Sequence, residues 1–467
     1  MKNNRKCVIF GAGERGTNIF RKLSIFFDVI AYADNNKDLW GRERNGAAII
    51  PPDDLTELVK KTGAAIFIAN ELHYLDIAAQ LDGYGLSYYN CENYFCYERE
   101  DGVWYPVSFG RPEACRKTGK DKFSVLFVQV KPCTRTNKIA QALKSRGVLT
   151  YSAYTASASD AGDAAYLSEF PFWTYGELLD FVNESEFDII HCSNEPDILV
   201  NLLLHSNKKV IHDCHDIVTM SKSAFTSTEA AVEFVANTQA DGVISTTEAM
   251  RELLIRKYGT DYEKTLVLGN YPLSSFKETE RLPKRSAADG EIHCVYEGMI
   301  VDRTQAENVP YRFYEPLFLR LAELGVHVHI YSSCVPEYLK QLSQANSHIH
   351  YEGNYGGQKL ITEMSQFDLG LLLFPVNTLY LRLSSPNKMT EYLSAGLPVV
   401  TNIPVYASIL SQNQCGGFLD IDSSDIISQM QAFQKLYISP NLCDACGFTM
   451  DANAERILNF YKKVISQ

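Results

Sequence analysis

The chain has 467 residues, which is too long for one ordinary hydrophobic core and predicts about three domains. Hydrophobic residues make up 46% and charged residues 21%, so we expect packed domains throughout and no long disordered stretch. The net charge of -12 disfavours bulk binding to nucleic acid and strong electrostatic docking on an anionic membrane, and it favours neutral or small partners.

The amino terminus combines basic side chains with an apolar run, as a secretory signal peptide does, but the run ends at Gly11 after a few residues. We therefore expect a first β-strand there. Later apolar stretches fall short of the ~20 residues that span a bilayer, so no membrane crossing is expected. The predicted location is cytoplasmic, with peripheral association at the inner face of the membrane as an alternative. The 12 cysteines are then expected to be reduced, and Cys443 and Cys446, a lone C-x-x-C without a nearby histidine, to bind no zinc.

Residues 7 to about 95 alternate short apolar runs with helical patterns, which predicts a parallel sheet with helices on its faces. The predicted strands are residues 7–10, 28–32 and 64–69. From about 98 to 121 the pattern lapses into glycine-, arginine- and lysine-bearing sequence. We place a domain boundary here, so that residues 1–118 form a small Rossmann-like domain followed by a linker that few contacts cross.

A G-x-G-x-x-G motif, made by Gly11, Gly13 and Gly16, stands between the first strand and a helix, and Asp34 follows about 20 residues on. This pattern predicts a nucleotide site in which the glycines admit a pyrophosphate and Asp34 binds a ribose. The segment resembles the small Rossmann-like domains fused to bacterial sugar-modifying enzymes, which bind a nucleotide-sugar or have no assigned ligand, and this resemblance implies a binding module. No Tyr-x-x-x-Lys follows, so we predict neither a dehydrogenase nor an epimerase.

A second series of the same kind covers residues 122–282. Its predicted strands are residues 123–128, 187–191, 209–213, 242–245 and 265–268. The segment from Lys131 to Lys138 follows the first of these strands and precedes a helix, a position suited to an anion. Arg135 is the candidate contact there, and a plain solvated loop is an equal alternative.

Histidine and aspartate residues end the strand at 209–213. Open α/β sheets bind ligands at the carboxyl ends of their strands, so His215 and Asp216 can fix sugar hydroxyls or exchange a proton with an acceptor. For His212 we prefer a buried core histidine. A zinc site is disfavoured because adjacent residues of an extended segment alternate between faces.

A third series covers residues 290–436, and a C-terminal helical segment follows at 437–467. The predicted strands are residues 292–296, 326–331, 348–351, 369–373 and 397–400. The strongest chemical signal is a polar loop at Ser385 that leads into a short helix, whose free N–H groups favour a phosphate. Lys388 adds a positive charge, and Glu391 can accept hydrogen bonds from ribose hydroxyls. Taken alone, the segment would favour an exposed surface pair of Lys388 and Glu391 instead.

The stretch Pro-Asn-Lys-Met-Thr-Glu-Tyr-Leu-Ser-Ala-Gly-Leu-Pro-Val-Val resembles the donor domain of the retaining glycosyltransferases of family 4 and their GT-B relatives. The resemblance covers roughly residues 122–467. It implies two Rossmann-like domains in GT-B architecture, with a nucleotide-sugar donor as substrate and no cofactor. Glu391 would hold the ribose and Lys388 the diphosphate.

Other landmarks agree with this resemblance. Gly298 resembles the glycine turn after the first strand of the donor domain, and Asn354 lies in a loop like that near the base. Arg303 is implied at the donor phosphates, while His215 and Asp216 match the segment that touches the donor sugar. One departure is Leu383, which stands where the family usually has a second glutamate.

We therefore predict a glycosyltransferase that builds bacterial surface polysaccharide or glycolipid, with a glycan or lipid-linked acceptor and no nucleic acid. The alternative is an inactive nucleotide-sugar-binding regulatory or scaffold protein, which the absence of the glutamate at Leu383 favours. No Asp-x-Asp pair stands at the end of a predicted strand, so turnover is expected to need no metal.

Overall fold

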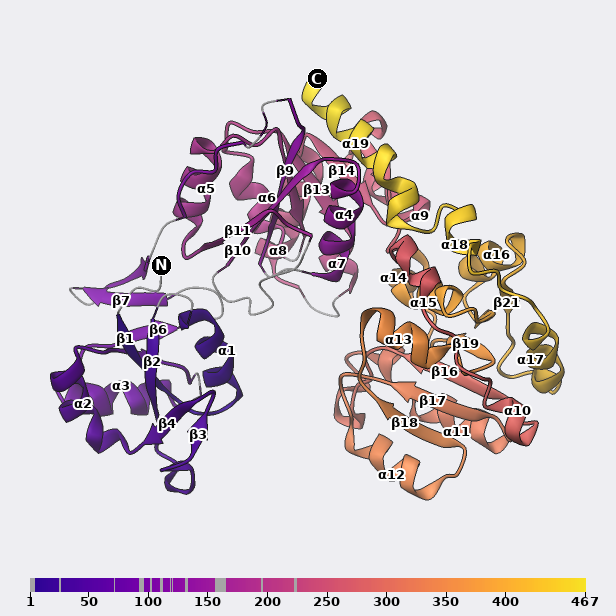
Figure 1. The fold of residues 1–467 in the computed structure, drawn as a ribbon, viewed down its shortest axis with the longest axis horizontal. Helices are drawn as coiled ribbons and strands as arrows, with labels where there is room; N and C mark the ends of the chain where they lie inside the picture. The colour runs from indigo at the N-terminus through magenta and orange to yellow at the C-terminus, as the bar shows by residue number, and fades with distance from the viewer. Residues whose placement is uncertain are drawn as a thin grey trace. The chain divides into compact units, whose positions relative to one another are not determined.

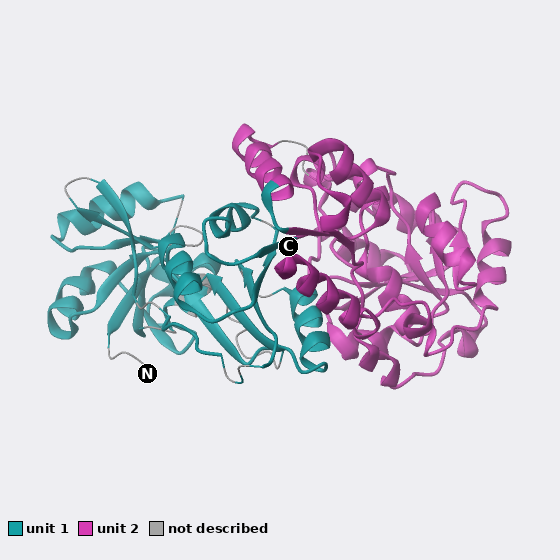
Figure 2. Ribbon diagram, turned by 90° about the horizontal axis from the view of Figure 1, so that it is seen from above, with its two compact units in different colours: residues 1–212, 239–241 teal, residues 213–238, 242–467 magenta. Residues whose placement is uncertain are grey.

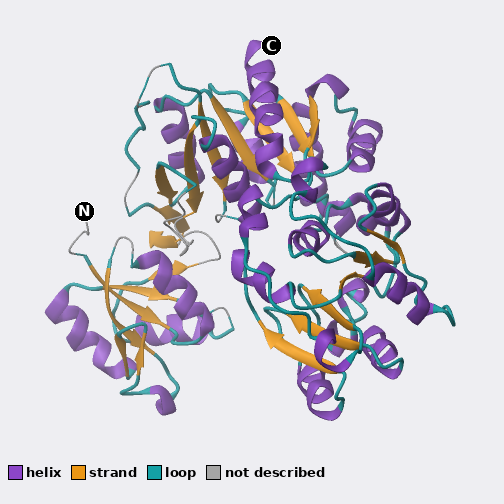
Figure 3. Ribbon diagram, turned by 45° about the vertical axis from the view of Figure 1, so that its right-hand side comes forward, coloured by secondary structure: helices purple, strands orange, loops and turns teal. Residues whose placement is uncertain are grey.

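The computed structural model describes most of the chain and contains three α/β sheets within the described residues (Figure 1). The described residues are 5–24, 27–70, 72–91, 96–100, 103–109, 112–117, 119, 121–130, 133–155, 165–194, 196–221 and 225–467. The chain divides into two compact units, residues 1–212 with 239–241 (unit 1) and residues 213–238 with 242–467 (unit 2), which Figure 2 colours separately. Helices cover the faces of the sheets (Figure 3).

The first sheet has the strand order β3-β4-β2-β1-β5-β6-β7-β8. Its strands are β1 (Lys6–Phe10), β2 (Asp28–Ala33), β3 (Glu43–Arg44), β4 (Ala47–Ile50), β5 (Ala65–Ile68), β6 (Tyr89–Cys91), β7 (Cys96–Glu100) and β8 (Val103–Val107). Its helices are α1 (Glu14–Leu23), α2 (Leu55–Thr62) and α3 (Tyr74–Gly83), with short 3-10 turns η1 (Lys37–Leu39) and η2 (Pro52–Asp54). Strands β4, β2, β1, β5 and β6 run parallel, and β7 and β8 form an antiparallel hairpin at the edge.

The region after the first domain is not the loosely attached linker that the sequence suggests. Strands β7 and β8 occupy its first part, and Lys117 then pairs with Asp188 at 2.7 Å. Phe109 packs its ring edge-on against Trp173, with centroids 5.0 Å apart, and Trp173 is 1% exposed within the hydrophobic core of the first sheet. These contacts lie inside unit 1, so the expectation that few contacts cross this junction is wrong. Residues 110, 111, 118 and 120 of the predicted linker, and Lys131 and Pro132 of the next loop, lie outside the described residues.

The second sheet has the order β11-β10-β9-β12-β13-β14-β15. Its strands are β9 (Ser124–Gln129), β10 (Leu149–Thr155), β11 (Ser168–Phe172), β12 (Ile189–Ser193), β13 (Val210–Cys214), β14 (Gly242–Ser245) and β15 (Thr265–Val267). Its helices are α4 (Thr134–Lys144), α5 (Tyr175–Glu184), α6 (Ile198–Leu203), α7 (Val218–Ser221), α8 (Ser227–Gln239) and α9 (Glu248–Tyr258), with η3 (Tyr262–Lys264) before β15. The boundary between the two units falls within β13.

The third sheet has the order β18-β17-β16-β19-β20-β21 and is parallel throughout. Its strands are β16 (His293–Glu297), β17 (His327–Tyr331), β18 (Ile349–Gly353), β19 (Leu369–Leu372), β20 (Val399–Thr401) and β21 (Gly416–Phe418). Its helices are α10 (Ser286–Asp289), α11 (Glu315–Glu323), α12 (Glu337–Ala345), α13 (Gly357–Met364), α14 (Leu379–Leu383), α15 (Asn387–Ser394), α16 (Pro404–Gln412), α17 (Ile426–Gln434), α18 (Leu442–Ala445) and α19 (Met450–Ser466). Short 3-10 turns are η4 (Ser274–Glu278), η5 (Arg303–Gln305) and η6 (Pro310–Arg312).

All three sheets follow one plan, in which the first strand is central and the chain builds outward on one side before it crosses to the other. In the third sheet β17 and β18 lie on one side of β16, and β19 to β21 on the other. Neighbouring connections leave a crevice at the carboxyl ends of the strands where the order reverses, and this is where such sheets bind ligands. Two hydrophobic clusters fill the two faces of the third sheet and hold its helices in place.

Candidate functional site

Unit 2 contains a cavity of about 240 Å³ at the carboxyl ends of strands from the second and third sheets. The residues after β13 and β15 contribute His215, Asp216 and Asn270. The remaining walls come from the end of β16, the segment from Tyr311 to Tyr314, Phe374 after β19, α14, and the loop that leads into α15. Asn270 holds this loop, because its side-chain amide donates to the Ser385 carbonyl at 2.8 Å. The cavity therefore combines polar groups from two sheets at the edge where α/β sheets bind ligands.

Helix α15 is fixed in place by Tyr392. The Tyr392 ring lies directly on Gly370 of β19, where a Cβ would come within 2.3 Å of the ring, so only glycine fits there. The Tyr392 hydroxyl also accepts a hydrogen bond from the backbone N–H of Glu297 at 2.9 Å, at the end of β16. Lys388 stands one helical turn before Tyr392 on the same face, and this anchor aims it at the end of β16.

Lys388 reaches the cavity over Gly298. Its ammonium donates to the Tyr296 hydroxyl at 2.9 Å and lies 4.0 Å from the centroid of the Tyr296 ring. A Cβ on Gly298 would come within 2.6 Å of Lys388 Cε, and Gly298 has φ +131°, so a side chain at this position would displace the lysine. Burial lowers the pKa of Lys388 to about 8, while Glu297 opposes the shift. A bound anion would restore the charged form.

The start of α15 also faces the cavity, since Ser385, Pro386 and Asn387 line it together with Lys388. Pro386 is the N-cap residue and supplies no side-chain hydrogen bond to the helix. The first N–H groups of a helix lack partners within the helix, so those of α15 are suited to a phosphate, as the sequence suggests. Glu391 lies on the next turn of α15, half-buried, and is not among the residues that line the cavity.

His215 and Asp216 follow β13 and line the same cavity. Asp216 accepts a hydrogen bond from the hydroxyl of Tyr380, on α14, at 2.9 Å. Burial and the neighbouring Asp216 raise the pKa of Tyr380 far above its ordinary value, so the hydroxyl keeps its proton and donates. The Asp216 carboxylate is thus oriented by a group that the sequence analysis does not identify, because Tyr380 lies in a five-residue helix without a recognisable motif.

The arginine at the cavity is Arg312, in η6, and not Arg303. Arg303 forms an ion pair with Glu315, with Nε 2.7 Å from Oε2, and is not among the residues that line the cavity. The guanidinium of Arg312 lies 5.5 Å from the Tyr311 ring and donates to the Met299 sulfur at 2.8 Å, and Arg312 lines the cavity. Arg312 sits in an irregular segment, so no periodicity in the sequence marks it.

The other residues that the resemblance implies lie elsewhere. Asn354 is exposed after β18 and is not among the cavity residues. Arg135 is 7% exposed in the first turn of α4, which belongs to unit 1. Leu383 is 9% exposed and lines a small void beside His215 and Asp216, so an apolar side chain stands where the family has a glutamate.

His212 and the cysteines can be compared with their predicted structural roles. His212 is fully buried in β13, with Nε2 3.2 Å from Asp197 Oδ1, so it is a core histidine. None of the 12 cysteines, all of which belong to the described part of the chain, forms a disulfide. One Asp-x-Asp pair, Asp420 and Asp422, does follow a strand, β21, that the sequence analysis does not predict, and both residues are exposed and outside the cavity.

A second cavity, of about 420 Å³, lies at the carboxyl ends of β1, β2 and β5 in unit 1. Asp34 lines it, but its carboxylate accepts hydrogen bonds from the N–H of Ala12 at 2.7 Å and of Asn36 at 2.8 Å. Gly11 has φ +112° and lines the cavity, whereas a Cβ on Gly16 would lie 1.9 Å from the Gly11 carbonyl, so that glycine permits the helix to pack on the turn. Gly13 faces open space and is not among the lining residues.

The polar residues around this second cavity are carboxamides, carboxylates and one imidazole. They are Asn35, Asn36, Asn70, Asp34, Asp76 and His73. Among the described residues that line it there is no lysine or arginine. Such a lining suits hydroxyl or amine groups better than a diphosphate.

Among the described residues, no helix combines the length and the apolar character that crossing a membrane requires. A comparison with curated protein sequences gives no match. Residues 149–270 match Glycosyltransferase Family 4, and residues 3–91 match the family described as C2185-like, N-terminal.

Several solved structures resemble the chain at low sequence identity. A glycosyltransferase from Rickettsia africae is 11% identical, with a TM-score of 0.54 over 74% of this chain and 100% of its own. The trehalose-6-phosphate structure from E. coli, bound with UDP-2-fluoro glucose, is 11% identical, with a TM-score of 0.50 over 73% of this chain and 99% of its own. HepE from Anabaena, in complex with UDP, is 15% identical, with a TM-score of 0.49 over 74% of this chain and 98% of its own. The chain therefore has the GT-B fold of glycosyltransferases similar to family 4, preceded by a Rossmann-like sheet.

Proposed function

We propose that the chain is a glycosyltransferase that binds a nucleotide-sugar donor in the cavity of unit 2. The observation that carries this proposal is that Lys388 at the start of α15 and Asp216 after β13 line one cavity. The match of residues 149–270 to Glycosyltransferase Family 4 and the GT-B fold support it. Structures of similar fold were solved with UDP or UDP-2-fluoro glucose, and we propose that a nucleoside diphosphate binds here in the same role.

Transfer of a sugar leaves a diphosphate with an additional negative charge. The start of α15, the Lys388 ammonium and the Arg312 guanidinium are the groups that would stabilise this leaving group. Because these cations are fixed parts of the protein, we propose that turnover needs no divalent metal. Glu391 would hold the ribose from the second turn of α15.

Asp216 and His215 line the same cavity as Lys388, but they follow β13, whereas Lys388 lies on α15. We propose that they hold the hydroxyls of the donor sugar, or accept the proton of the attacking acceptor hydroxyl. In this scheme Asp216, oriented by Tyr380, supplies the carboxylate that Leu383 does not. The acceptor we propose is a growing surface glycan or glycolipid at the inner face of a membrane.

The alternative is a protein that binds nucleotide-sugars without turnover, and Leu383 is the observation that favours it. A panel of UDP-, GDP- and ADP-sugars separates the two functions when thermal shift and release of the nucleoside diphosphate are measured in parallel. Stabilisation by one donor, with release that increases on addition of a glycan acceptor, supports the transferase. Stabilisation without any release, across acceptors, supports the binding protein, and no stabilisation by any donor contradicts both.

A further inference from the structure

Histidines gather on one face of the third sheet at the amino ends of its strands. In the strand register His293 of β16 lies opposite His327 of β17, and His329 lies opposite His350 of β18. His348, directly before β18, places its ring 4.5 Å from that of His327. The proposed donor cavity of unit 2 lies at the opposite, carboxyl ends of these strands. Since the five-residue strand β17 spans roughly 16 Å at ~3.3 Å per residue, the histidines lie about one strand length from that cavity. The proposed sugar transfer does not use this group.

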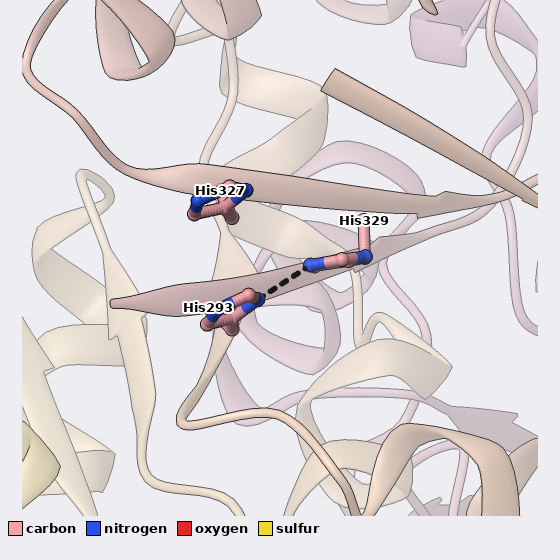
Figure 4. Close-up of side chains that lie close together, drawn as sticks. All are labelled: His293, His327 and His329. Atoms are coloured by element: carbon pink, nitrogen blue, oxygen red, sulfur yellow. Dashed lines mark hydrogen bonds between the residues drawn. The ribbon is translucent and has the colours of Figure 1, made fainter. Parts of the chain in front are cut away.

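The inner group consists of buried His293 and His329 and half-buried His327, whose nitrogen atoms lie within 4.8 Å of one another (Figure 4). However, the rings of His293 and His327 are stacked 4.4 Å apart at an angle of 6°. The lone pair of an imidazole nitrogen lies in the plane of its ring, so one ion cannot lie in two parallel planes. His293 Nδ1 is instead hydrogen-bonded to His329 Nε2 at 2.9 Å, as the dashed line shows. This inner group is a hydrogen-bonded support and not a metal cage.

An outer group at the edge of the sheet has more favourable geometry. Glu291 Oε2 lies 2.5 Å from His327 Nε2 and 3.9 Å from His348 Nε2, so both nitrogens approach one carboxylate oxygen. The rings of His327 and His348 are inclined by 35° and do not stack in parallel. In a tetrahedral zinc site, bonds of ~2.1 Å place ligand atoms about 3.4 Å apart. The observed separations bracket this value, and small side-chain rotations would equalise them.

Each histidine of the outer group also has a partner for its other nitrogen. His327 Nδ1 is 2.9 Å from His350 Nε2, and His348 Nδ1 is 3.3 Å from the Ser347 hydroxyl. Each of these partners can accept the Nδ1 proton, so that Nε2 is left for a metal once the proton toward Glu291 is displaced, as is typical of histidine ligands to metals. The side chains of Glu291 and His348 are 50% and 30% exposed, so an ion can enter from solvent.

We propose that Glu291, His327 and His348 bind one divalent cation of the zinc class, with water in the fourth position. Two imidazoles and one carboxylate are ligands that zinc accepts. The ion would replace the proton shared between Glu291 and His327. Since the three ligands precede or begin β16, β17 and β18, the ion joins three neighbouring strands and stabilises this edge of the sheet.

The test is calorimetric titration of Zn²⁺ alone into the full chain, which is first stripped of metal with a chelator. The protein is kept reduced so that the cysteine thiols are in the same state in the wild type and in every variant. The variants are His348→Asn and Glu291→Gln, and the matched control is His205→Asn, an exposed histidine in the second sheet's region. We expect the wild type and the control to bind one equivalent of Zn²⁺. Each of the two variants should bind it with an affinity lower by about tenfold or more. The same equivalent should raise the melting temperature of the wild type and the control only.

Circular dichroism of the metal-free variants checks that they fold. A wild type that binds no zinc, or variants that bind it as the wild type does, would overturn the site. Loss of zinc in His329→Asn together with unchanged binding in His348→Asn would overturn it as well, because it would assign the ion to the inner group.

Discussion

The cavities of unit 1 and unit 2 occupy equivalent places in their sheets but differ in their charged residues, since among the described residues lysine and arginine line only the second. Each lies at the carboxyl ends of parallel strands where the strand order reverses, after β1 in the first sheet and after β16 in the third. The first is lined by carboxamides and carboxylates, and its Asp34 is already bound to the N–H of Ala12. The second is lined by Lys388 and Arg312. The fold therefore determines where a ligand binds, and the side chains determine which ligand it is.

The largest effect is expected from the carboxylate of the second cavity. Asp216→Asn should lower the rate of sugar transfer by about a hundredfold to ten thousandfold, because it removes the negative group beside the donor sugar. The affinity for the nucleoside diphosphate should change little, since Lys388 and the start of α15 remain. Initial rates of diphosphate release and calorimetric dissociation constants measure the two quantities. Asp422→Asn, an exposed carboxylate outside the cavity, is the control, and an equal loss in both variants would contradict the assignment.

The first sheet should depend on its contact with the second. Phe109→Ala removes a ring that packs against Trp173 and should cost about 3–5 kcal/mol of unfolding free energy. Tyr105→Ala, on the exposed face of β8, should cost much less. Denaturant unfolding followed by tryptophan fluorescence compares them. If Phe109→Ala were as stable as Tyr105→Ala, the packing of Phe109 on Trp173 and on the first sheet's own Phe27 and Phe67 would not stabilise this junction.

Gly298→Ala should act through Lys388. The added methyl group collides with Lys388 Cε, so the affinity for a nucleoside diphosphate should fall by about tenfold to a hundredfold, and that for the nucleoside should not change. In a Lys388→Ala background the same change should have little further effect, because the displaced group is gone. Additive losses of diphosphate affinity in this double-mutant cycle would show that Gly298 is needed for its backbone conformation and not to leave room for Lys388.

The pH dependence of diphosphate binding should report Lys388. Burial lowers the pKa of Lys388 from its ordinary value of 10.5 to about 8. The ligand-free protein therefore loses the ammonium charge as the pH rises through 8. The affinity should fall from that point, and binding at pH 9 should take up a proton, which calorimetry in two buffers of different ionisation enthalpy measures. Lys388→Arg should bind without proton uptake. Proton uptake of equal size in both proteins would assign the titration to another group.

A chelator tests two predictions together, that turnover needs no metal and that a zinc ion at Glu291 stabilises the third sheet. We expect EDTA to leave the initial transfer rate unchanged at a temperature well below unfolding, and to lower the melting temperature if zinc occupies the Glu291 site. Loss of transfer that Mg²⁺ or Mn²⁺ restores would contradict metal-independent turnover.

Much of the fold could be predicted from the sequence, because buried parallel strands are continuous apolar runs. The predicted runs at 28–32, 242–245 and 369–373 correspond to β2, β14 and β19. Strand β10, Leu149–Thr155, is buried along its whole length but carries serine, threonine and tyrosine, so hydrophobicity does not reveal it. The hairpin of β7 and β8 was not predicted because both strands are largely exposed, β7 is mostly polar, and β8 contains a proline, which argues against a strand.

Residues of the candidate site could be predicted only where they belong to one continuous sequence motif. Lys388 belongs to a contiguous stretch with a helix start, and His215 and Asp216 end a strand, so local sequence indicates all three. Tyr380 and Arg312 reach the cavity from short irregular segments, and only the packing of separate loops brings them there. The glycine motif at Gly11 correctly indicates a turn and a cavity, but not that Asp34 is already occupied by the turn itself.

Calorimetric titration of a nucleoside diphosphate into variants of each cavity tests the central claim most directly. The variants are Lys388→Ala in the second cavity, Asn70→Ala in the first, and Lys435→Ala as an exposed control in unit 2. We predict that Lys388→Ala weakens binding by about tenfold or more. Asn70→Ala and Lys435→Ala should bind as the wild type does. Binding that Lys388→Ala leaves intact and Asn70→Ala abolishes would contradict the claim and assign the diphosphate to the first cavity.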